Sequence, residues 1–117
     1  MKCYRYELFK DGEPTGMGII RGISLLWLDE DLETSLLNGF SKMPIPAFFY
    51  QEHQGLKTET YFTEWGKSDL KDSIQRVLEV FKKDGTYEVR EVVREIADED
   101  IEYDDEWQVI TVDHLQE

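Results

Sequence analysis

Residues that could do chemistry are densest between positions 97 and 106, where seven of ten residues are Asp or Glu. Such carboxylates could coordinate Ca²⁺ or attract a cationic surface. An EF-hand loop needs Gly at its sixth position and Glu at its twelfth, and loops counted from Asp98 or Asp100 supply neither. We therefore assign no metal site here. We interpret the segment as a candidate surface for a basic partner, with these candidate residues: Asp98, Asp100, Glu102, Asp104, Asp105 and Glu106.

Nucleophiles and metal-binding side chains are sparse elsewhere. His53 and His114 lack the short spacing of a metal-binding pair. Cys3 is the single cysteine, and its place in a strand-like segment favours burial over nucleophilic catalysis. Gly16-Met17-Gly18 lacks both the strand-to-helix setting and the lysine of a phosphate-binding loop. The sequence thus predicts no catalytic residue, no metal ligand and no cofactor.

A small enzyme is the alternative that single residues support. One set of residues resembles, in its order along the chain, the conserved groups of ADP-ribosyltransferase-like folds. The set consists of Arg5, the run Tyr61-Phe62-Thr63, and the later Glu102 and Glu106. A ligand-binding domain with an aromatic-lined pocket is a related alternative, although aromatic side chains also seal the edge of a core. The aromatic candidates for such a pocket are Trp27, Tyr50, Phe62, Trp65 and Trp107.

The charge distribution favours a basic protein as the partner. The chain has 26 acidic and 13 basic residues, for a net charge of -13, and residues 95–117 contain ten acids and no Lys or Arg. A negative surface repels nucleic acid backbones and anionic lipids but attracts basic proteins. We therefore predict a non-catalytic protein-binding module of inhibitor or immunity type, with no direct nucleic acid binding and no membrane contact.

Two other interpretations of the acidic segment stay open. The acids could imitate the phosphates of a nucleic acid and so inhibit a DNA-binding protein. They could also form a solvated face that keeps the protein soluble.

Length and composition indicate one domain in a reducing compartment. A chain of 117 residues has the size of a single domain, and its six Phe, six Tyr and three Trp can fill one core. One cysteine cannot form an internal disulfide, so we expect a cytoplasmic location. The segment after Met1 is polar and strand-like, which predicts no export signal.

Hydrophobic periodicity predicts two helices and six strands. Residues 3–9 alternate in polarity, and Asp11-Gly12 favours a turn into a second strand at 15–23, whose glycines suggest a bulge or a close backbone approach. One helix is expected over 29–40, capped by acids in its first turn. A second is expected to start at Ser68 as N-cap and to end at Gly85. Further strands are predicted at residues 47–52, 56–63, 86–96 and 107–112.

The predicted order is β-β-α-β-β-α-β-β. It corresponds to an α+β fold with a mostly antiparallel sheet covered by two helices.

Overall fold

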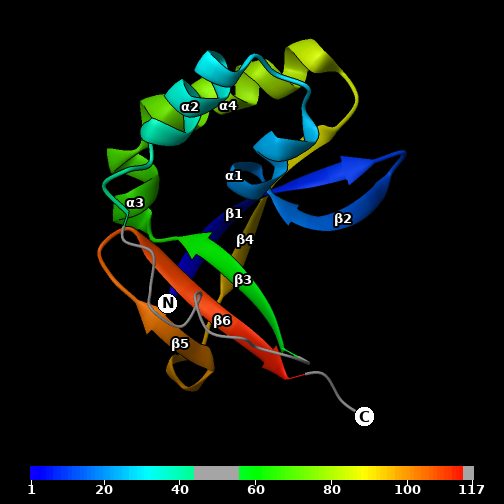
Figure 1. Cartoon of the computed structure of the whole chain (residues 1–117). Coiled ribbons are helices and arrows are strands. Elements are labelled where there is room, and N and C mark those ends of the chain that lie inside the picture. The colour runs from blue at the N-terminus through cyan, green and yellow to red at the C-terminus, as the bar shows by residue number, and fades with distance from the viewer. Residues whose placement is uncertain (44–55, 115–117) are drawn as a thin grey trace.

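The first strand, β1 (Lys2–Lys10), organises the sheet because it pairs with three other strands. The computed structural model describes residues 1–43 and 56–114. Strand β4 (Glu88–Glu95) runs antiparallel along one edge of β1. The other edge is shared by β2 (Glu13–Gly18), which pairs with the second half of β1, and β3 (Leu56–Phe62), which meets it only at Tyr4. Figure 1 shows β2 and β3 diverging from β1.

The sheet continues from β3 through β6 to β5. Strand β6 (Gln108–His114) pairs with β3 along its whole length, and β5 (Ile101–Asp104) pairs with the far side of β6. All these pairs are antiparallel, so the described part of the chain contains a six-stranded antiparallel sheet. The α+β class and the antiparallel sheet predicted from the sequence are confirmed.

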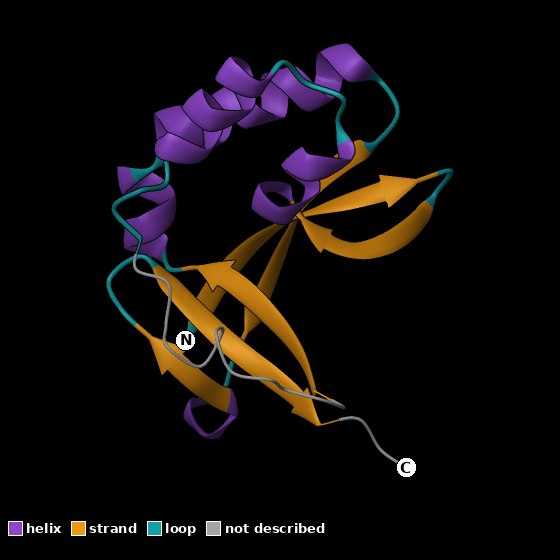
Figure 2. Ribbon diagram, in the orientation of Figure 1, coloured by secondary structure: helices purple, strands orange, loops and turns teal. Residues whose placement is uncertain are grey.

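Four α-helices lie in the described residues (Figure 2). The two predicted ones correspond to α2 (Glu30–Asn38) and α4 (Lys71–Asp84), which pack against each other. Two shorter ones were not expected, α1 (Ile19–Gly22) and α3 (Glu64–Asp69). Single 3₁₀ turns follow α1 (Ile23–Leu25, η1) and precede β5 (Asp98–Asp100, η3).

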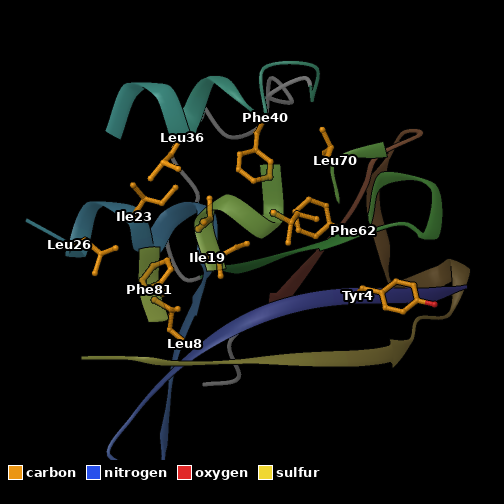
Figure 3. Close-up of a cluster of buried hydrophobic side chains, with 12 residues drawn as sticks. Tyr4, Leu8, Ile19, Ile23, Leu26, Leu36, Phe40, Phe62, Leu70 and Phe81 are labelled. Carbon is orange, nitrogen blue, oxygen red and sulfur yellow. The ribbon is translucent and has the colours of Figure 1, made fainter. Parts of the chain in front are cut away.

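The main core lies between the helices and the sheet (Figure 3). Helix α4 contributes a stripe of Ile74, Val77 and Phe81, which share one face because a helix turns once every 3.6 residues. Leu8 of β1 and Ile23 after α1 are buried in the same cluster. The amphipathic stripe predicted for the long helix is therefore confirmed.

A smaller cluster covers the opposite face of the sheet. It consists of Cys3, Tyr61, Ile96 and Val109. Cys3 alternates with Tyr4 along β1, so their side chains point to opposite faces. Cys3 is fully buried, and burial raises the pKa of its thiol, so the reactive thiolate is disfavoured.

The second strand is shorter than predicted. It ends at Gly18, and Ile19 begins α1, whereas the sequence pattern predicted a strand over 15–23. Ile19 and Ile23 are four residues apart and are both buried, a helical spacing that was mistaken for part of a strand. The pairing of β1 with β2 is irregular, because its register shifts between Glu7 and Phe9; the sequence had suggested a bulge or a close backbone approach in this strand.

The start of the long helix was also predicted wrongly. Ser68 lies inside α3 and caps nothing; α3 is capped by Thr63, whose hydroxyl accepts a hydrogen bond from the Gly66 amide at 2.9 Å. Helix α4 begins after Leu70 without a side-chain cap. Its end at Gly85 is confirmed, since this residue has the left-handed φ of +79° that glycine tolerates best.

Helix α2 begins without a side-chain cap. Asp29 occupies the N-cap position of α2, but its side chain makes no capping hydrogen bond, so the acids of the first turn act at most through the helix dipole. The predicted strand at 47–52 and the turn after it lie outside the described residues.

Candidate functional site

The acidic candidates lie along the border of the sheet that β5 forms. We define the acidic edge as the exposed side chains of η3, β5 and the turn after β5. Figure 1 shows η3 at one end of β5 and the connection to β6 at the other, on the side of β6 away from β3. The acidic edge consists of Asp98, Glu99, Asp100, Glu102, Asp104 and Glu106.

The two acids of β5 are exposed, while its apolar side chains are partly covered. Glu102 and Asp104 are exposed, whereas Ile101, which packs against the smaller cluster, and Tyr103 are half-buried. The β5–β6 register shifts between Ile101 and Tyr103, which interrupts the strict alternation of side chains, so it is the border position of β5 that leaves both acids at the surface. The structure therefore brings five of the six predicted partner-binding residues to one exposed border.

None of the acids of the acidic edge forms an ion pair with another described residue. The ion pairs of the described residues lie elsewhere, for example between Lys67 and Glu91 at 2.6 Å and between Arg94 and Glu59 at 3.6 Å. The chain has no Lys or Arg after Arg94. The charge of the acidic edge is thus not neutralised by any ion pair within residues 1–43 and 56–114.

Asp105, the sixth predicted residue, is used inside the protein. Its carboxylate accepts hydrogen bonds from the Tyr103 hydroxyl at 2.8 Å and from the Trp107 amide at 2.8 Å. It also accepts from the amide and the side chain of Gln108, both at 3.0 Å. Burial raises the pKa of Asp105, but these hydrogen bonds outweigh burial and hold the pKa below its ordinary value. Asp105 therefore shapes the β5–β6 turn.

A polar group on the same face of the sheet as Cys3 centres on Tyr61. Its hydroxyl donates to Glu59 at 2.5 Å and accepts from Arg94 at 2.9 Å. Burial and the bond to Glu59 raise the pKa of Tyr61 to about 12, although Arg94 lowers it. Tyr61 therefore stays protonated near neutral pH, where it can donate a hydrogen bond but cannot act as a base.

Arg5 lies in the gap between β2 and β3. Its Nη2 donates to the Gly16 carbonyl of β2 at 2.8 Å, and its Nη1 donates to the Thr60 carbonyl of β3 at 3.2 Å. The side chain is only 7% exposed, and its guanidinium carbon lies 5.9 Å from the centre of the Tyr61 ring. Arg5 thus joins two strands that no ladder joins directly in the described sheet.

The residues behind the enzyme alternative are only partly brought together. Arg5, Tyr61 and Phe62 line one cavity, but Glu102 and Glu106 belong to the acidic edge and do not line it. Glu102 and Glu106 therefore do not share a site with Arg5.

The aromatic candidates also separate. Phe62 lines the cavity, whereas Trp27 is fully exposed and Trp65 is 56% exposed. Trp107 donates its indole N–H to Asp69 at 3.0 Å and packs at the rim of the main core. Tyr50 and His53 lie outside the described residues. The sequence pattern identified Phe62 for a pocket but missed the residues of α1 and α2 beside it, since their role depends on tertiary packing.

The described residues contain neither a metal-binding cluster nor a membrane-spanning helix. No group of three or more His, Cys, Asp or Glu side chains there is arranged to hold a metal ion. No helix there is long and apolar enough to cross a membrane.

Comparison with known protein families, with curated proteins and with solved structures finds no match to this chain.

Proposed function

We propose that the protein is a non-catalytic binding module of inhibitor or immunity type, and that its acidic edge engages a basic surface of a partner protein. The supporting observation is the exposed, uncompensated row of acids along η3, β5 and the following turn. Among the described residues, no cation lies within ion-pair distance of these acids. Their field is therefore available to a cationic partner.

Electrostatic attraction is the physical basis of the proposed binding. A patch of one sign accelerates encounter with an oppositely charged surface and disfavours partners of the same sign. Exposed charges are screened beyond about 8 Å at physiological ionic strength, so this attraction weakens as salt rises. Binding that did not depend on salt would have to use another surface.

A cytoplasmic location belongs to the same proposal. Cys3 is free and buried, and the chain has no second cysteine with which to form an internal disulfide. Such a protein gains nothing from an oxidising compartment, and a reducing one keeps the thiol intact. Localisation of the tagged full chain in its own cells checks this part.

The test compares two variants that carry the same net charge. Each replaces five exposed acids by amides, which changes the net charge from -13 to -8. The edge variant carries Asp98→Asn, Asp100→Asn, Glu102→Gln, Asp104→Asn and Glu106→Gln. The control variant changes exposed acids of the β1–β2 turn, α2 and α4, and it carries Asp11→Asn, Glu30→Gln, Asp31→Asn, Asp72→Asn and Glu79→Gln.

The measurement is quantitative capture of basic proteins from a lysate of the protein's own cells, on immobilised wild type and on each variant. We expect the wild type and the control variant to recover the same basic protein, and the edge variant to lose most of it. Equal recovery on all three chains would contradict the proposal. So would equal loss on both variants, because that result would show a response to net charge alone.

A further inference from the structure

The cavity that Arg5 and Phe62 line has a volume of about 710 Å³ and opens beside the gap between β2 and β3. Its volume falls within the range of about 300–1,000 Å³ that is typical of pockets for small organic molecules. Arg5 lies against it together with Gly16, Gly18 and Thr60 of the two diverging strands. The cavity thus exists because β1 changes partners along one edge.

The walls of the cavity are mainly apolar. Phe40 and Phe62 face each other with ring centres 6.3 Å apart, and Figure 3 shows both beside Ile19 where the helices meet the sheet. Apolar walls favour a ligand with an aromatic or aliphatic body. The apolar lining residues are Ile19, Ile20, Leu37, Phe40, Met43 and Phe62.

The charge of the lining is opposite to that of the protein. The chain has twice as many acidic as basic residues, yet the described residues that line the cavity include Arg5 and Arg21 and no Asp or Glu. Arg5 forms no ion pair with any described residue, and its two hydrogen-bond acceptors are neutral carbonyls. A buried charge without a counter-ion is costly, so an anion beside it is favoured.

The guanidinium also keeps room for such an anion. It has five N–H donors, of which the two carbonyls take one each. Gly18 has no side chain to cover it, and a Cβ there would lie 3.7 Å from Cζ and from Nη1. Carboxylates, sulfonates and phosphates are the groups that a guanidinium binds most strongly.

From these contacts we propose that the cavity binds a small organic anion with an apolar body. The anionic head lies beside Arg5 and is attracted by Arg21 at the exposed side, and the apolar body lies against Phe40 and Phe62. This site is independent of the acidic edge, and a ligand in it would not need a partner protein.

The probe is 8-anilino-1-naphthalenesulfonate, a fluorescent aromatic anion, and its neutral counterpart is N-phenyl-1-naphthylamine. A protein with a net charge of -13 repels the sulfonate everywhere except at a locally positive site. We expect the sulfonate to bind the full-length native chain with one saturable site and to bind more tightly than the neutral dye. Its binding should shift the backbone NMR signals of Gly16, Gly18 and Thr60 and leave those of β5 in place.

Two leucines of α2 provide matched variants. Leu37 lines the cavity and is 43% exposed, whereas Leu32 is 38% exposed and does not line it. Leu37→Glu adds a negative charge at the rim, so we expect it to weaken sulfonate binding about tenfold through like-charge repulsion. Leu32→Glu adds the same charge to the same helix and should change the affinity less than about twofold. Both sites are exposed, so both variants should fold.

Three outcomes would overturn the proposal: no saturable sulfonate binding, equal affinity for the neutral dye, or equal weakening by Leu37→Glu and Leu32→Glu. These outcomes would not contradict partner binding by the acidic edge, because the capture experiment uses neither leucine.

Discussion

Asp105 differs from the neighbouring acids in what its carboxylate contacts. Four hydrogen bonds from Tyr103, Trp107 and Gln108 converge on it, whereas Asp104 beside it is exposed and forms no ion pair with a described residue. The two residues are adjacent in the sequence and identical in type. Only the turn after β5 distinguishes the structural acid from the surface acid.

Replacing Asp105 by Asn should therefore destabilise the protein. The change removes a charged acceptor and turns an NH₂ group toward N–H donors, which should lower the free energy of unfolding by about 1–3 kcal/mol at pH 7. Asp104→Asn is the matched control and should change it by less than about 0.5 kcal/mol. Urea unfolding of the three chains measures both effects. A similar loss in both variants would contradict the role assigned to Asp105.

The destabilisation caused by Asp105→Asn should depend on pH. The pKa of Asp105 is lower in the folded protein than its ordinary value of 3.8, so its contribution is complete above that value and is lost as the pH falls through the folded-state pKa. The stability difference between wild type and Asp105→Asn should thus shrink below pH 3.8. A difference that stays constant down to acid unfolding would contradict this assignment.

Single residues show where prediction from the sequence stops. The polarity pattern placed Cys3 in a strand and suggested its burial, which the structure confirms, because strand alternation is a local property. It could not show that Arg5 would bridge Gly16 and Thr60, which are 11 and 55 positions away in the chain. Contacts of this kind depend on the order of the strands in the sheet. The spacing of apolar residues along the sequence does not contain that order.

At the scale of elements, α3 is fixed against the β5–β6 turn by a close backbone approach. The Thr63 amide donates to the Trp107 carbonyl at 3.0 Å, and Gly66 lies so close to the same residue that a Cβ would overlap its carbonyl. The short helix and the acidic turn are therefore positioned together. Any side chain at Gly66 would have to displace backbone rather than a flexible side chain.

Gly66→Ala should consequently destabilise the protein by about 2–3 kcal/mol. Helix propensity alone favours Ala over Gly by about 1 kcal/mol, so the expected loss opposes the intrinsic trend. Gly18→Ala is the comparison, because its Cβ would lie 3.5 Å from the nearest atom, the Tyr6 carbonyl oxygen, an ordinary contact distance. Thermal unfolding of both variants is the measurement. A more stable Gly66→Ala variant would show that α3 is not held this way.

The elements were predictable in proportion to how strong their local pattern is. The apolar stripe of α4 was recognised because it repeats over at least two helical turns. The alternation of β1 and β4 was recognised because each strand contains several pairs of alternating polar and apolar residues. The helix α1 was missed because four residues are too few to show a helical period. Residues 97–106 were recognised from the sequence as an acidic segment, but strand β5 within them was not among the predicted strands, and its border position follows from the strand order.

At the scale of the whole molecule, the net charge of -13 opposes folding as well as attracting a partner. Few acids form ion pairs within the described residues, and each of these pairs has at least one side chain that is more than a third exposed, so each contributes little. Self-repulsion therefore outweighs the ion pairs in the electrostatic balance of the native state.

Salt should stabilise this protein. Raising NaCl from 20 to 200 mM screens the repulsion, and we expect the free energy of unfolding in urea to rise by about 1 kcal/mol. The edge variant should respond less, because its acids no longer lie crowded along η3 and β5. A decrease in stability with salt would mean that ion pairs, and not repulsion, dominate.

The most direct measurement of the central claim is the dissociation constant of the captured basic protein, titrated calorimetrically at 150 mM NaCl against the wild type, the edge variant and the control variant. Neutralising the acidic edge should weaken binding at least about tenfold, whereas the control variant, with the same net charge, should stay within about threefold of the wild type. Equal weakening in both variants would show that net charge, and not the row of acids along β5, attracts the partner.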